Sequence, residues 1–213
     1  MLTRILPLKV VPAGDNKACG ILVGNLLNID TFVRDFAAAV ALYDLCDPGS
    51  PNLAIPSEHI SALRMMSGSQ GAIAIFNLAK TLAAIRGSLN KVPTLLPHID
   101  TDALKTAEKK LKDAFPNVEA IRHGVAHGGE ALATEHNVDK HMPSGTFETP
   151  IGPMRAENGG MIFLNRAFAD RTFMTMWGKE VVSYSLDNAS LAGVMSVVEL
   201  VAFAFEKARR FSA

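Results

Sequence analysis

Residues 100–116 read DTDALKTAEKKLKDAFP and carry the signals of one complete helix. Asp100 is a typical N-cap residue, because its carboxylate can accept hydrogen bonds from the first free backbone amides of a helix. Proline cannot continue a helix, so Pro116 ends the segment. The apolar side chains between them recur at helical spacing and are Leu104, Ala107, Leu111 and Phe115. The stretch therefore predicts an amphipathic helix that buries one face against a larger helical core.

The same period recurs nearer the N-terminus, between residues 28 and 46. This segment is rich in alanine, and either Asp30 or Thr31 is the expected start of its helix, because these residue types favour N-cap positions. The run DPG at residues 47–49 breaks the pattern. We therefore expect a second long helix here, followed by a loop over residues 48–56.

Three further segments also follow helical spacing. Residues 57–85 are long enough for one extended helix, but Gly68 and Gly71 are expected to divide it, since glycine disfavours helix interiors. Residues 117–132 predict a shorter helix, and residues 187–205 predict a final one. Together with the two segments above, they predict a bundle of about five helices.

A different period interrupts the helical pattern before the final helix. Alternation typical of strands occurs in residues 161–164, 172–176 and 180–186. The residues WGK at 177–179 are expected to form a tight turn between the last two strands. These segments predict a small antiparallel β-meander, inserted at about residues 160–186 before the C-terminal helix. Residues 134–160 show no regular pattern.

The composition favours a packed, mainly α protein. Apolar residues make up 48% of the 213 residues and charged residues 20%, which provides enough buriable surface to offset chain entropy and excludes wholesale disorder. A chain of this length is expected to build one core rather than two. We therefore predict a single helical domain over residues 1–213, with the β-meander as an insertion.

Charge and targeting signals favour a cytoplasmic protein. The formal net charge is +0, so no global field attracts the chain to nucleic acid or to an anionic membrane. Cys19 and Cys46 lack C-x-x-C spacing and are expected to be reduced, buried thiols. Residues 1–11 do not resemble a signal peptide, and the most apolar predicted helix, residues 189–205, is too short for a bilayer. We therefore expect no membrane partner.

Titratable side chains gather in residues 121–141, which contain four of the six histidines. His123 and His127 are four residues apart, so on a helix they share one face, which is also the geometry of a two-histidine metal site. A third ligand would come from Glu130, His136 or His141. Because the H-E-x-x-H zinc pattern is absent, we predict neither a metal nor a cofactor.

Arg122 and His127 suggest a different chemistry in the same segment. A guanidinium is permanently charged and holds phosphate well, whereas an imidazole titrates near neutral pH and can move a proton from a ribose 2′-hydroxyl. On an ideal helix the two side chains point roughly 140° apart, at about 100° per residue. They can still converge on one ligand at a helix end or between two subunits.

The string Arg122-His123-Gly124-Val125-Ala126-His127, which follows Phe115-Pro116 in a helical chain, resembles the R-x4-6-H motif of the HEPN superfamily (higher eukaryotes and prokaryotes nucleotide-binding). The resemblance implies a bundle of four or five helices, often dimeric, in which two copies of the motif face each other. Active members of that superfamily are metal-independent ribonucleases, and others bind nucleotides without catalysis. His123 fits the polar residue that commonly follows the arginine.

The resemblance implies a homodimer that binds RNA or a nucleotide and cleaves RNA. Arg122 would hold phosphate, His127 would act as the general acid or base, and His123 would support either role. We expect Lys109, Lys112 and Glu130 to contact the substrate, although the lysines also fit a solvated helix face. In the alternative hypothesis the chain is a non-catalytic helical interaction protein, in which Arg122 forms a salt bridge and His127 closes its helix.

Overall fold

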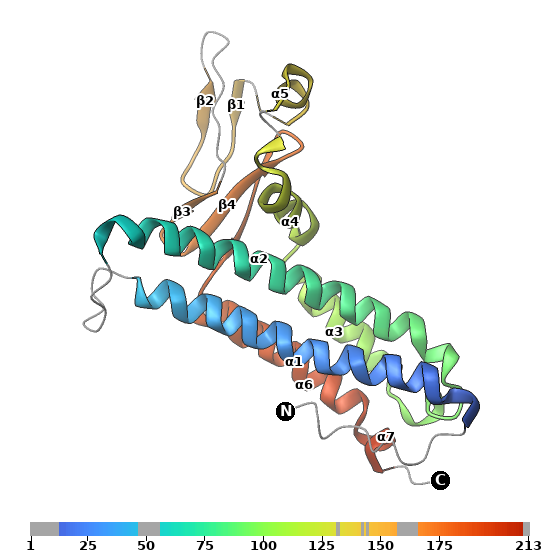
Figure 1. Cartoon of the computed structure of the whole chain (residues 1–213). Coiled ribbons are helices and arrows are strands. Elements are labelled where there is room, and N and C mark those ends of the chain that lie inside the picture. Colours follow the sequence, from blue (N-terminus) through green and yellow to red (C-terminus); the bar gives the residue numbers. More distant parts are fainter. Residues whose placement is uncertain are drawn as a thin grey trace. The chain divides into compact units, whose positions relative to one another are not determined.

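The chain is mainly α, as its sequence predicts (Figure 1). The computed structural model describes residues 13–46, 56–130, 133–141, 143, 145–156 and 166–210. The α-helices in these ranges are α1 (Asn16–Leu45), α2 (Ser57–Ser88), α3 (Thr101–Ala114), α4 (Val118–His127), α5 (Glu135–His141), α6 (Asn188–Ala204) and α7 (Glu206–Arg210). Short 3-10 helices are η3 (Ala13–Asp15), η4 (Leu89–Lys91) and η5 (Leu96–His98).

Five short strands form two antiparallel sheets in the described residues. The strands are β1 (Gly145–Phe147), β2 (Met154–Ala156), β3 (Ala167–Ala169), β4 (Thr172–Trp177) and β5 (Glu180–Ser185). β1 pairs with β2, and β4 lies between β3 and β5. The predicted β-meander before the C-terminal helices is thereby confirmed. Its first expected strand, residues 161–164, lies outside the described residues, as does most of the loop expected at 48–56.

The contacts divide the chain into two compact units. The first comprises Met1–Phe36, Asn77–Pro116 and Leu191–Ala213, and the second comprises Ala37–Phe76 and Asn117–Ser190. The division falls within α1, α2 and α6. The single domain over residues 1–213 stays a prediction.

The first unit is a helical bundle. α3 begins as its sequence predicts, because the Asp100 carboxylate accepts hydrogen bonds from the Asp102 and Ala103 amides. The Asp100 amide donates to the carbonyl of Ala204 at the end of α6, at 2.9 Å. The Phe115 ring packs edge-on against Phe36 of α1, with centroids 6.0 Å apart. The predicted apolar face of α3 is buried in this core: Leu104, Ala107, Leu111 and Phe115.

α1 begins at Asn16, earlier than the expected start at Asp30 or Thr31. Asp30 lies inside the helix and is almost fully buried, so that prediction was wrong. The buried side chains of Cys19, Leu22 and Leu26 extend the apolar face toward the N-terminus. Burial of this face outweighs the cost of about 1 kcal/mol for each helical glycine in the segment.

α2 is one continuous helix, so the predicted division at Gly68 and Gly71 was also wrong. In the second unit these glycines allow the helix to approach the β3-β4-β5 sheet. A Cβ at Gly68 would overlap the Phe173 ring, and a Cβ at Gly71 would overlap the Tyr184 hydroxyl. The Tyr184 hydroxyl donates a hydrogen bond to the Gly68 carbonyl at 2.5 Å. Glycine therefore permits close packing here, despite its poor helix propensity.

One stretch of the described chain, Ser57–Lys91, is long and apolar enough to cross a membrane by length and composition alone. Its mean hydropathy is 1.3 over an 18-residue window, and 44% of that window is buried. A core helix meets the same criterion. The absence of a membrane partner and the cytoplasmic location stay predictions.

Candidate functional site

The predicted motif lies on α4, which is shorter than expected. The helix ends at His127 rather than at residue 132, and Gly128 and Gly129 form the turn that follows. Asn117 occupies the N-cap position without a side-chain hydrogen bond. Because His127 is the last residue of α4, its side chain lies at a helix end, where convergence with Arg122 was expected to be feasible.

Gly124 brings α4 close to strand β4 in the second unit. A Cβ at this position would lie 2.6 Å from Thr175 Cγ2 and 3.0 Å from the Met176 carbonyl oxygen. The second distance involves backbone, which cannot move aside as a flexible side chain can. Only glycine therefore fits without a local shift, and this close approach places the neighbouring α4 side chains beside the end of β4.

Three histidine rings surround Trp177, the last residue of β4. The His123 ring stacks on the indole, with centroids 5.2 Å apart and an interplanar angle of 18°, and the His141 ring stacks at 4.4 Å and 29°. The His127 ring is tilted, with its centroid 6.0 Å from the indole. We call His123, His127, His141 and Trp177 the histidine–tryptophan cluster.

Arg122 and His127 converge beside this cluster. Arg122 Nη1 lies 3.5 Å from His127 Nε2, at the limit of hydrogen-bond distance. The guanidinium also lies over the Phe76 ring of α2, 5.4 Å from its centroid, which is a cation–π geometry. The long arginine side chain thus compensates for the angular separation expected from five residues of ideal helix.

Glu130 flanks the other side of the His127 ring. Glu130 Oε2 lies 3.0 Å from His127 Nδ1, although the angle does not meet hydrogen-bond geometry. Of the two neutral tautomers, an arginine donor at Nε2 and a carboxylate near Nδ1 favour the one that carries its proton on Nδ1. In that state Nε2 has the lone pair that a general base requires. The His127 side chain is 35% exposed and the Glu130 side chain 72%, so both can meet solvent.

His141 is the most buried member of the cluster, with 6% of its surface exposed. Burial lowers its pKa, and the nearby Lys140 and His136 lower the pKa further. The Gly178 amide donates to His141 Nδ1 at 3.4 Å, which also requires that nitrogen to be unprotonated. His141 is therefore a neutral ring packed against Trp177 rather than a candidate proton donor.

Comparisons with protein-family models, curated proteins and solved structures gave no match. Of the predicted site residues, the structure brings together Arg122, His123, His127 and Glu130. Lys109 and Lys112 are exposed on α3, which belongs to the first unit, and their role stays a prediction.

No three His, Cys, Asp or Glu residues in the described ranges are grouped so that they could hold a metal ion. His123 and His127 do share a face, with ring centroids 5.8 Å apart. Glu130 lies beside His127, but these three side chains are not grouped so that they could hold a metal ion. The two-histidine metal site is therefore incomplete within the described part of the chain.

The sequence did not indicate that Trp177 and Phe76 would join the site, and it suggested His141 only as a third metal ligand. The sequence predicts Trp177 only as part of a tight turn, whereas its side chain packs against the three histidines. His141 lies on α5, within a segment that shows no regular pattern. The Trp-Gly pair at the predicted turn could have indicated this packing, because a large aromatic side chain at a turn needs a surface to pack against.

Proposed function

We propose that this chain is a HEPN-like helical protein that binds RNA or a nucleotide and cleaves RNA without a metal ion. One observation carries the proposal: Arg122 Nη1 and His127 Nε2 lie 3.5 Å apart on side chains that are only partly buried. A phosphate held by the guanidinium would lie beside the imidazole nitrogen that accepts a proton. The resemblance to the HEPN motif supports the same assignment.

The reaction would be an intramolecular transesterification. His127 Nε2 takes the proton of a ribose 2′-hydroxyl, whose oxygen attacks the adjacent phosphorus atom. The bond from phosphorus to the 5′-oxygen breaks, and the leaving oxygen receives a proton from a protonated His123. The products are a 2′,3′-cyclic phosphate and a 5′-hydroxyl. Arg122 stabilises the charge that develops on the phosphoryl oxygens.

Glu130 would support His127 in addition to its predicted contact with substrate. A carboxylate 3.0 Å from Nδ1 stabilises the imidazolium that forms when Nε2 accepts the proton. Because Glu130 is largely exposed, solvent weakens this interaction. We assign Glu130 as a positioning residue and retain Lys109 and Lys112 as predicted phosphate contacts.

A non-catalytic interaction protein is the second candidate. The stacking of His123 and His141 on Trp177 supports it, because ring packing explains these side chains without chemistry. In this case Arg122 and His127 stabilise the end of α4. The two candidates differ in one measurable respect, namely whether RNA is cleaved.

The decisive experiment incubates purified protein with single-stranded RNA in the presence of a chelator. We expect cleavage that leaves 2′,3′-cyclic phosphate ends and is blocked by a 2′-deoxy substitution at the cleaved position. His127→Asn should reduce the rate by about 10²–10⁴-fold, because it removes the general base. Arg122→Lys should also reduce the rate, since lysine keeps the charge but loses the planar fork.

His59→Asn is the matched control, because His59 is an exposed histidine at the start of α2. It should cleave RNA at the wild-type rate. Cleavage that persists in His127→Asn would indicate a contaminating nuclease and contradict the assignment. A complete absence of cleavage by folded wild-type protein would favour the non-catalytic candidate.

A further inference from the structure

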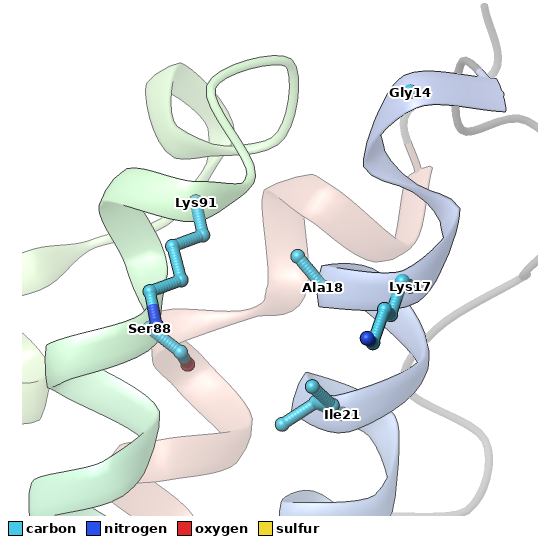
Figure 2. A pocket seen from close by; sticks show the side chains of 6 residues that line it. All are labelled: Gly14, Lys17, Ala18, Ile21, Ser88 and Lys91. Atoms are coloured by element: carbon cyan, nitrogen blue, oxygen red, sulfur yellow. The ribbon is translucent and has the colours of Figure 1, made fainter.

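A pocket of about 420 Å³ lies in the first unit, between the start of α1 and the end of α2 (Figure 2). Its lining residues are Gly14, Lys17, Ala18, Ile21, Ser88 and Lys91. Small-molecule sites in proteins commonly have volumes of about 300–1,000 Å³. The pocket shares no residue with the histidine–tryptophan cluster, so it can have a role that does not depend on the proposed RNA cleavage.

The segments that form this pocket are held by a specific contact. Asp15 lies in η3, immediately before α1, and Thr94 lies between η4 and η5. The Thr94 hydroxyl donates to Asp15 Oδ2 at 2.8 Å, and the Thr94 amide donates to the same oxygen at 3.4 Å. This contact ties the start of α1 to the segment that follows Lys91. It also engages the carboxylate of Asp15 with two hydrogen-bond donors.

The charged groups that line the pocket are both positive. In Figure 2 the Lys91 side chain extends toward Ser88, and the Lys17 side chain lies alongside α1; both residues line the pocket. Ser88 Oγ donates to the Ile85 carbonyl at 2.8 Å, which leaves its lone pairs free to face the Lys91 ammonium. The six lining residues include no acidic residue.

Helix dipoles explain Lys91 but not Lys17. A cation near the C-terminal end of α2 and η4 is favourable, whereas Lys17 lies in the first turn of α1, where the dipole disfavours positive charge. That turn contains no acidic residue within α1, and the carboxylate of Asp15, immediately before it, is engaged by Thr94. A bound anion would interact favourably with both the dipole and the two ammonium groups.

The remaining wall is apolar. Ala18 and Ile21 lie one helical turn apart on α1, and Ile21 is 53% exposed although it lines the pocket. An inorganic ion would leave this surface in water. A ligand with both an anionic head and an apolar part would cover it.

We propose that this pocket binds a small organic phosphate. The phosphate lies between the Lys17 and Lys91 ammonium groups, and the organic part contacts Ala18 and Ile21. A phosphate dianion matches two cations more closely than a carboxylate does, because it carries twice the charge. Each ammonium group then contributes a charge-assisted hydrogen bond.

Phenyl phosphate is a suitable probe, because it joins a dianion to an apolar ring. Its binding can be followed by titration while the isoleucine methyl resonances of the protein are recorded by NMR. We expect saturable shifts at the Ile21 methyl group below about 10 mM. Lys17→Gln and Lys91→Gln should each weaken binding by about fivefold or more, whereas Lys110→Gln, an exposed lysine on α3, should not.

Two further measurements test the phosphate contact and the apolar contact separately. One uses inorganic phosphate as the probe, and the other uses the Ile21→Ala variant. Inorganic phosphate should bind more weakly than phenyl phosphate, and Ile21→Ala should weaken phenyl phosphate alone. Equal binding of both probes would contradict the role of the apolar wall. The proposal would be overturned by the absence of saturation, or by wild-type affinity in both lysine variants. RNA cleavage by the Lys17→Gln variant tests the other site independently and is expected to be unchanged.

Discussion

At the scale of single residues, Gly124 disfavours the helix that contains it but allows that helix to pack closely against β4. In the sequence it interrupts the R-x4-H string and weakens the predicted helix. In the structure it allows α4 to contact Thr175 and the Met176 carbonyl. The residue that costs helix stability is therefore the one that permits the packing of the site, because a side chain there would occupy the space of the strand.

Gly124→Ala should destabilise the protein by about 1–3 kcal/mol, since the added methyl group overpacks the contact between α4 and β4. The free energy of unfolding can be measured by urea denaturation. Gly20→Ala on α1 is the matched control, because a Cβ there meets no atom within 4 Å. The control should gain about 0.5–1 kcal/mol, and a similar gain in Gly124→Ala would contradict the packing described above.

The buried side chain of His141 is expected to make the free energy of unfolding depend on pH. Burial holds its pKa below the ordinary value of 6.5, so between the two pKa values the unfolded chain binds a proton that the folded chain does not. The stabilisation is complete above pH 6.5 and is lost as the pH falls through this window. The free energy of unfolding, measured at several pH values between 7.5 and 5, should therefore decrease with decreasing pH.

His141→Phe keeps an aromatic ring against Trp177 but removes the titrating group. Its free energy of unfolding should vary less with pH between 7.5 and 5 than that of the wild type. It also loses the acceptor for the Gly178 amide, which lowers its stability relative to the wild type at pH values where His141 is neutral. An unchanged slope would show that other groups govern the pH response.

At the scale of secondary-structure elements, α3 was predictable from local signals. Its cap, its apolar face and its end all lie within 17 consecutive residues, and each acts through neighbours in sequence. β4 and β5 were also predicted from their local sequence, but only β5 alternates in burial, because residues 173–176 of β4 are all buried. α5 and the β1-β2 hairpin were not predicted, because they are short and their sequences lack a regular apolar period.

Asp100→Ala should lower the stability of α3 and therefore of the protein by about 1 kcal/mol, because the Asp102 and Ala103 amides lose their acceptor. Thermal or urea denaturation followed by circular dichroism measures this loss. Asp113→Ala, at the exposed C-terminal end of the same helix, should be neutral or slightly stabilising, since a negative charge there opposes the dipole. Equal losses in both variants would contradict the capping role.

At the scale of the whole molecule, the HEPN resemblance predicts a homodimer. Sedimentation velocity should show a species of twice the 22.8 kDa chain mass. If the dimer also completes the proposed site, RNA cleavage per chain should fall on dilution below the dissociation constant. A 22.8 kDa species at every concentration, with undiminished cleavage, would exclude the dimer.

Contacts between distant parts of the chain explain why the predicted start of α1 and the predicted division of α2 were wrong. α1 extends to Asn16 and α2 continues through Gly68 and Gly71, although local propensity favours a break at those glycines. Buried apolar side chains stabilise the first extension, and close contact with the β3-β4-β5 sheet requires the glycines of α2. Neither effect can be inferred from a window of neighbouring residues.

The sequence by itself determined the mainly α class, the meander before the C-terminal helices, and the residue types of the candidate site. It did so because periodicity, caps and proline act locally. Only the tertiary structure decided that Arg122 reaches His127, that Trp177 packs among three histidines, and that two lysines share a pocket. These arrangements depend on where a helix ends and how closely elements approach, and side-chain packing across the chain fixes both.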